Sequence, residues 1–260
     1  MAPTSRSFPP ETEKLGPRWG LTRRTVLRGL AFIFATAGLP RLASALARAI
    51  APPALQAIGP LEFLTEAEYA FVAAACAGFV PADETGPGAL EADAPRYIDR
   101  KLAAPGGGAA AWYMDGPFEP GVTTQGWQVD LTPAGLYRQT IPQMNDAAKT
   151  RFGAAFANLS AEDQDTFLAA MQKKELDGDG VYASLFFATM LGDTIEGLMS
   201  DPLYGGNKDF IGWKMIGFPG TRYNWLPWLD REGEPINLPI VGMYGTAETY
   251  AARMRKGTGR

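Results

Sequence analysis

The stretch DPLYGGNKDFIGWKMIGFPG, residues 201–220, departs furthest from the helical patterns in the rest of the chain. Glycine costs about 1 kcal/mol and proline about 3 kcal/mol in a helix interior, so its five glycines and two prolines predict a long structured loop. We call residues 201–220 the signature loop. Gly205, Gly206 and Asn207 permit positive φ angles and a sharp turn. The loop carries more apolar surface than a solvated loop would, so we expect burial against its own helices or another protein: Tyr204, Phe210, Trp213, Met215, Ile216 and Phe218.

Two runs within this loop, DPLYGGNK at 201–208 and GWKMIGFPG at 212–220, resemble the signature of the gluconate 2-dehydrogenase subunit 3 family. Members of that family are small, non-catalytic subunits of bacterial periplasmic dehydrogenases. The resemblance implies a large FAD-containing partner of the glucose-methanol-choline type, often joined by a c-type cytochrome. It therefore places FAD in the partner and any c-type haem in a third subunit, with no cofactor in this chain.

The signature loop and the tail that follows supply the candidate partner contacts. Interface energy concentrates in aromatic residues, so we expect contacts from Tyr204, Gly205, Gly206, Asn207, Phe210, Trp213, Lys214 and Phe218, with Trp225 and Trp228 as anchors. The alternative is that these side chains pack only within the chain.

The amino terminus has the pattern of an export signal. Arg23 and Arg24 precede an uncharged run, residues 29–40, and small-x-small cleavage sites follow at residues 43–47. Twelve residues are too few to span about 30 Å of hydrocarbon as a helix. The pattern therefore predicts a twin-arginine signal over residues 1–47, read by the twin-arginine translocase. Because this route moves folded proteins, we expect the complex in the periplasm, at the outer face of the inner membrane.

The composition narrows the function classes further. Residues 1–47 carry seven basic and two acidic side chains, which leaves 17 basic and 26 acidic in residues 48–260. A body this acidic repels nucleic-acid phosphates. The chain has no histidine, which removes the common zinc, copper and haem ligand sets and the Ser-His-Asp arrangement. Cys76, the single cysteine, is expected to be a buried structural thiol. No dinucleotide or Walker fingerprint is present, so we expect no catalytic, cofactor-binding or metal-binding residues.

Capping patterns predict the first helices of the body. Thr65 with Glu68 forms a capping box for a helix that stops before Pro81. A second helix is expected from about Glu91 to Leu102, with Ile98 and Leu102 facing inward.

Three further helices follow. Thr132 caps one that has Pro133 at its first position and that Pro142 should kink or divide. Ser160 with Asp163 opens the next, and Val181–Leu191 is apolar nearly all round, which indicates the central helix of the core. Residues 177–180, DGDG, are interpreted as a turn, because the twelfth position of an EF-hand loop would be Ala188.

Together these patterns predict a mainly α fold in a single domain, residues 48–260. We expect an irregular domain of about five to seven helices with long loops rich in glycine, proline and aromatic residues. Residues 221–260, which we call the C-terminal arm, are predicted to be extended, with a frayed basic end.

Two functions fit this sequence. The first is the accessory subunit of a sugar, polyol or sugar-acid dehydrogenase, which stabilises the flavin subunit and carries it through export. The second is an independent periplasmic carbohydrate-binding protein or hydrolase, in which aromatic rings beside Asn207, Asp209 and Asp201 bind a sugar.

Overall fold

The computed structural model describes residues 60–104, 114–119, 121, 122, 124–222, 224–235 and 237–257, which belong to one compact unit. The predicted export signal, including Arg23 and Arg24, lies outside these residues. The described residues form α3 (Glu66–Phe79), α4 (Ala94–Ala103), α6 (Pro133–Phe152), α7 (Ala161–Gln172), α8 (Ala183–Met199), α9 (Ile211–Met215) and α10 (Ala247–Gly257). Four short 3-10 helices accompany them: η1 (Phe156–Asn158), η2 (Pro202–Tyr204), η3 (Lys208–Phe210) and η4 (Leu226–Trp228). Only isolated β-bridges occur in these ranges, so the mainly α prediction is confirmed.

The predicted caps set the helix starts. Thr65 and Glu68 form both halves of the capping box of α3, and Thr132 and Ser160 accept backbone hydrogen bonds at the starts of α6 and α7. Helix α4 begins at Ala94, three residues later than expected, because Asp93 adopts a left-handed conformation with φ 57°.

Pro142 does not divide α6, so of the two expected effects, a kink or a division, the division is excluded. The helix continues from Pro133 to Phe152 with Pro142 inside it. Proline removes one backbone hydrogen bond, and burial of one face on both sides of this position offsets the loss. The fully or nearly fully buried residues of that face are Leu136, Tyr137, Ile141, Met144 and Ala148.

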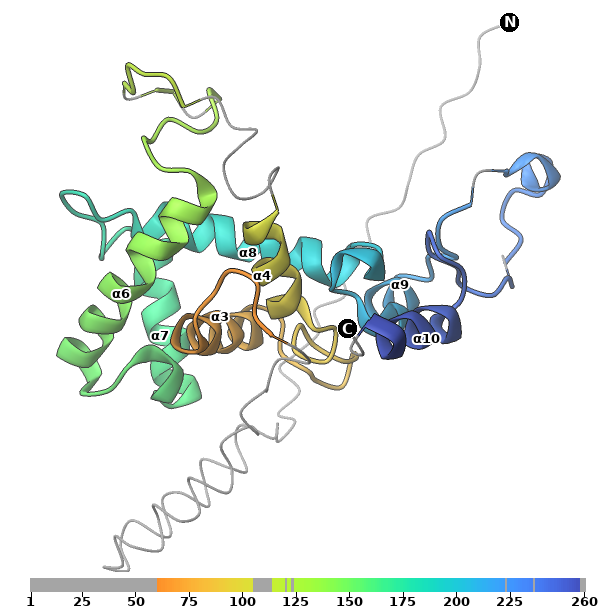
Figure 1. The fold of residues 1–260 in the computed structure, drawn as a ribbon, viewed down its shortest axis with the longest axis horizontal. Helices are drawn as coiled ribbons and strands as arrows, with labels where there is room; N and C mark the ends of the chain where they lie inside the picture. Colours follow the sequence, from red (N-terminus) through yellow and green to blue (C-terminus); the bar gives the residue numbers. More distant parts are fainter. Residues whose placement is uncertain are drawn as a thin grey trace, which may run out of the picture. The chain divides into compact units, whose positions relative to one another are not determined.

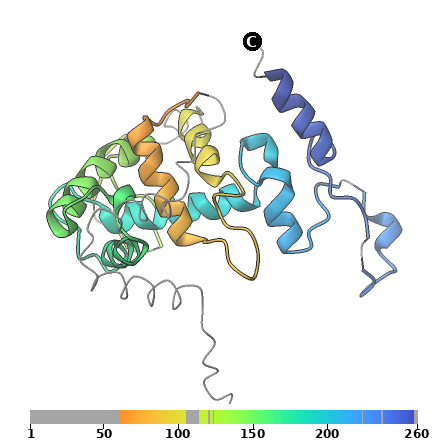
Figure 2. The same cartoon turned by 90° about the horizontal axis from the view of Figure 1, so that it is seen from below.

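Helix α8 is the central helix, as predicted. It contacts α3, α4, α6 and α7, and the ring of Phe186 lies 5.0 Å from Tyr137 and 6.0 Å from Phe71. Figures 1 and 2 show α8 running from the α6–α7 end of the domain to α9. Its apolar side chains are not all enclosed, since Leu191 is half-buried and Ile195 is 48% exposed.

A buried ionic network joins α4, α6 and α8. Asp193, only 5% exposed, accepts hydrogen bonds from Lys101 Nζ at 2.7 Å and from Tyr137 OH at 2.7 Å. Burial raises the pKa of Asp193, and Lys101 and Tyr137 oppose that shift. The network aligns three helices through one carboxylate.

Asp99 fixes the segment that leads into α3. Its buried carboxylate accepts backbone hydrogen bonds from Glu62, Phe63 and Leu64 at 2.8–3.0 Å. Sequence reasoning missed this role. The sequence did contain a sign of this role, because Asp99 falls on the same face of α4 as the apolar residues Ile98 and Leu102.

Cys76 is a buried thiol, as predicted. Its sulfur lies 3.2 Å from Thr194 Oγ1, whose hydroxyl donates to the Met190 carbonyl. Burial raises the pKa of Cys76 to about 12, so the thiol stays protonated and donates to Thr194.

The Asp177 region is a turn, as interpreted from the sequence. The Asp177 carboxylate accepts hydrogen bonds from the backbone N–H and the hydroxyl of Ser184 at the start of α8. This contact assigns Asp177 a local structural role.

The C-terminal arm differs from the prediction, because its end is helical. Residues Ala247–Gly257 form α10, where an extended and frayed segment was expected. The helix is held from its first turn, since Tyr250 is buried against the signature loop. None of the helices described here combines the length and hydropathy needed to cross a bilayer.

Candidate partner interface

The signature loop satisfies the backbone groups at the C-terminal end of α8. A helix leaves its last carbonyls without helical partners. The indole N–H of Trp213 donates to the Met199 carbonyl at 2.7 Å, and the Asn207 amide donates to the Ser200 carbonyl at 2.8 Å. Asn207 also accepts from the Gly212 N–H at 2.8 Å. The loop is therefore built around the end of α8.

Two glycines of the loop allow backbone to approach backbone. A Cβ on Gly206 would clash with the Gly197 carbonyl, and a Cβ on Gly212 would clash with the Leu198 carbonyl. Positive φ angles at Gly205 and Asn207 confirm the predicted sharp turn. These glycines serve close packing, which the sequence did not reveal.

The candidate contact residues divide into two groups. Asn207, Phe210 and Trp213 are buried within the chain, as are Gly205 and Gly206. The rings of Phe210 and Trp213 stack at 5.2 Å. For these five residues the structure shows the internal packing that the sequence left as an alternative.

The second group consists of loop residues that are exposed. Tyr204 is 55% exposed, Phe218 is 38% exposed, and Lys214 is exposed. Met215 and Ile216 are also exposed, so of the two expected possibilities, burial against the chain's own helices does not apply to them. Met215 is the last residue of α9 and Ile216 is its C-cap, whereas the buried residues of this short helix are Gly212 and Trp213.

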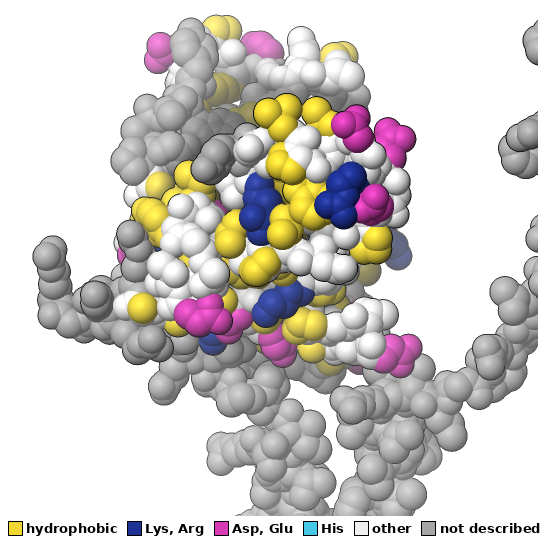
Figure 3. Space-filling model, turned by 90° about the vertical axis from the view of Figure 1, so that its right-hand side faces the viewer, with side chains coloured by type: hydrophobic (Ala, Val, Ile, Leu, Met, Phe, Trp, Pro, Cys, Tyr) yellow, Lys and Arg dark blue, Asp and Glu magenta, His cyan; other side chains and the backbone are white. Residues whose placement is uncertain are grey.

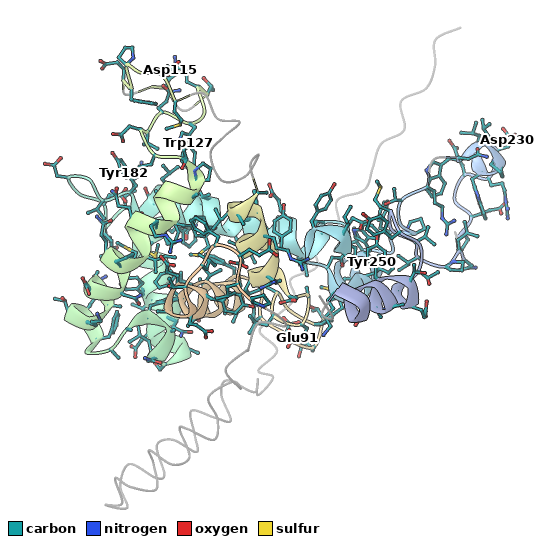
Figure 4. All side chains as sticks on the ribbon, in the orientation of Figure 1. Glu91, Asp115, Trp127, Tyr182, Asp230 and Tyr250 are labelled. Atoms are coloured by element: carbon teal, nitrogen blue, oxygen red, sulfur yellow. The ribbon has the colours of Figure 1, made fainter. Side chains whose placement is uncertain are left out.

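Trp225 and Trp228 lie in the C-terminal arm and are half-buried. The guanidinium of Arg231 lies 4.5 Å from the centre of the Trp228 ring. Leu226 and Leu229 beside them are exposed, and Figure 4 shows nearby Asp230 at the tip of the arm's loop. Both tryptophans remain candidate anchors.

Asp201 fixes the C-terminal arm to the signature loop. Its carboxylate accepts hydrogen bonds from Tyr250 OH at 2.6 Å, from Met243 N at 2.8 Å and from Leu203 N at 2.9 Å. Burial and the bond to Asp201 raise the pKa of Tyr250 to about 12, so the hydroxyl remains a donor. Figure 4 shows Tyr250 beside α9. The role of Tyr250 was missed, although the spacing of Ala247, Tyr250 and Ala251 is helical.

These contacts leave an apolar face at this end of the domain. Figure 3 shows hydrophobic side chains gathered there beside Lys and Arg side chains. Within the described ranges, no group of three or more Asp, Glu, Cys or His side chains could hold a metal ion. The arrangement suits contact with another macromolecule.

The comparisons with known proteins identify the family of the chain. The family model for gluconate 2-dehydrogenase subunit 3 matches residues 66–220, more than half of the chain. No curated protein and no solved structure matches significantly. The match runs from the start of α3 to the end of the signature loop. The chain therefore belongs to the gluconate 2-dehydrogenase subunit 3 family.

Proposed function

We propose that this chain is the non-catalytic accessory subunit of a periplasmic FAD-dependent dehydrogenase that oxidises a sugar, polyol or sugar acid. The observation that carries the proposal is the family match over residues 66–220, because the family is named as a subunit of a dehydrogenase. The FAD-containing subunit is of the glucose-methanol-choline type, and a c-type cytochrome can complete the complex.

Two features of the chain support this role. The signature loop is closed against α8 by Asn207 and Trp213, yet it keeps Tyr204 and Ile216 open to solvent. A folded scaffold that presents apolar side chains at one end is suited to binding a larger subunit. The Arg23-Arg24 pattern supplies the export signal, so the chain stabilises the flavin subunit and carries it through the twin-arginine translocase.

Affinity purification of the full chain from its own bacterium tests the complex. We expect a yellow, flavin-containing protein with sugar or polyol dehydrogenase activity to co-purify in constant ratio. Recovery of the chain without a flavoprotein would contradict the proposal.

Fractionation of cells tests the escort role. Replacing Arg23 and Arg24 by lysine should leave both subunits and the dehydrogenase activity in the cytoplasm. The matched control replaces Arg6 and Arg18 by lysine, which keeps the charge and the arginine pair and should leave export unchanged. If the flavin subunit reached the periplasm with the Arg23→Lys/Arg24→Lys variant, the escort role would be wrong.

A further inference from the structure

The C-terminal arm lies beyond the family match but is tied to it. The match ends at Gly220, and the arm begins there with a parallel bridge between Gly220 and Val241. Thr221 N donates to the Val241 carbonyl at 2.7 Å, and Met243 N and Tyr250 OH both donate to Asp201. The arm is thus fixed on the signature loop by residues on both sides of the family boundary.

Both segments that meet at this junction carry exposed apolar side chains. Ile216 and Met243 are 62% and 61% exposed, and Met215 and Phe218 are 42% and 38% exposed. Three of these side chains come from the signature loop and Met243 comes from the arm. Exposed apolar side chains gathered on one face mark interaction sites on soluble proteins, and Figure 3 shows hydrophobic side chains at this end of the domain.

The charge around this face gives the chemistry of its partner. Lys208 and Lys214 are exposed on the signature loop. In the part of the chain described here neither forms a direct ion pair, although Lys208 favours the charged form of Asp93 and Lys214 that of Glu248. Residues 48–260 carry a net negative charge, so the charge of these two lysines is opposite to that of the domain as a whole. Complementary charges across an interface favour correct association. A partner face with an apolar centre and carboxylates at its rim fits this arrangement.

We propose that the arm and the signature loop together form the docking face for the dehydrogenase subunit, with Asp201 holding the arm in place. The inference rests on the proposed function, because the family identifies a dehydrogenase as the partner. Beyond that function, it specifies the face of this chain that binds the dehydrogenase subunit and includes the arm, which lies outside the family match, in that face. It also specifies that the dehydrogenase subunit presents carboxylates to this face.

A second exposed apolar surface provides the control. Leu191 and Ile195 of α8 line a shallow groove with Lys174 and neighbouring residues. Ile195 is 48% exposed, so Ile195→Asp introduces the same charge as Ile216→Asp on a comparable side chain elsewhere.

The test measures the affinity of the full chain for the purified flavin dehydrogenase subunit. We expect Ile216→Asp and Met243→Asp each to weaken binding about tenfold or more, and Ile195→Asp to leave it unchanged. Lys214→Glu should weaken binding at low salt and less so at high salt, whereas Lys173→Glu at the end of α7 should not. Circular dichroism checks that each variant is folded.

Each contrary outcome is informative. If wild type does not bind the flavin subunit, the proposed function fails and this inference fails with it. If wild type binds and the Ile216 and Met243 variants bind equally well, only the docking face is wrong. If Ile195→Asp loses binding while the Ile216 and Met243 variants keep it, the interface lies on α8 and the proposed face is wrong. If the chain self-associates and Ile216→Asp makes it monomeric, the face belongs to a second copy and the proposal is overturned.

Discussion

The hydroxyl of Tyr250 donates a 2.6 Å hydrogen bond to the carboxylate of Asp201, 49 residues earlier in the chain. Asp201 belongs to the signature loop and Tyr250 to α10, so the bond joins the family's matched region to a segment beyond it. The same carboxylate accepts from the backbone of Met243 and Leu203. One buried carboxylate therefore organises both parts of the proposed docking face.

Removing the Tyr250 hydroxyl should loosen the arm. In Tyr250→Phe, the buried carboxylate loses a donor, which costs about 1–3 kcal/mol. Hydrogen exchange should accelerate in residues 241–250 and remain unchanged in α3. The control is Tyr204→Phe, since Tyr204 is 55% exposed and should tolerate loss of its hydroxyl. Equal exchange in wild type and Tyr250→Phe would show that this bond does not hold the arm.

Two helical glycines should respond oppositely to alanine. Gly212→Ala places a Cβ against the Leu198 carbonyl and should destabilise the domain by about 2 kcal/mol or more. A Cβ added at Gly192 in α8 would meet no atom within 4 Å, so Gly192→Ala should stabilise by about 0.5–1 kcal/mol. Urea unfolding measures both. Similar effects of the two changes would contradict the close packing of α9 on α8.

Breaking the buried ion pair should be costly and pH-dependent. Lys101→Met leaves the Asp193 carboxylate with the Tyr137 hydroxyl as its donor. We expect a loss of about 2–4 kcal/mol at pH 7, discounted from values for fully buried pairs because Lys101 is partly exposed. The pKa of Asp193 is already raised by burial, and loss of the cation raises it further. The cost should therefore shrink as the pH falls and Asp193 becomes protonated.

Urea unfolding of the Lys101→Met variant at pH 7 and pH 5 measures this effect. Lys149→Met is the control, because its ion pair with Asp146 is exposed and should contribute about 0.5 kcal/mol or less. A cost that is equal at both pH values would indicate that Asp193 does not take up a proton in the variant.

Asp93 should make the domain less stable as the pH rises. Burial raises the pKa of Asp93 to about 6, against opposing effects of Lys208, Arg96 and Arg100, while an unfolded aspartate titrates near about 3.9. Because the folded pKa is the higher one, stability is lost between about pH 4 and pH 6, by at most about 3 kcal/mol. Asn tolerates the left-handed backbone of this position.

Asp93→Asn should therefore raise the unfolding free energy at pH 7.5 and change it little at pH 4. Denaturant unfolding at the two pH values checks this, with Asp230→Asn at an exposed position as the control. A destabilised Asp93→Asn variant at pH 7.5 would mean that the charged carboxylate is needed there.

Local patterns in the sequence determined where several helices of the body start and end, but not α9 or α10. Thr65 with Glu68, Thr132 with Pro133, and Ser160 predicted three helix starts, because capping depends on residues within one turn. Pro202 predicted the end of α8 near Ser200 for the same reason. The order of residues in the signature loop was also sufficient to identify the family.

Tertiary structure alone decided which side of the loop is buried. Phe210 and Trp213 pack inward while Ile216 and Phe218 remain exposed. The signature loop has no hydrophobic periodicity, so its sequence does not indicate which of these side chains are buried. It depends on backbone contacts with the end of α8 and on the bond from Tyr250 to Asp201. These contacts join residues 14 and 49 positions apart, so their geometry exists only once the helices have packed.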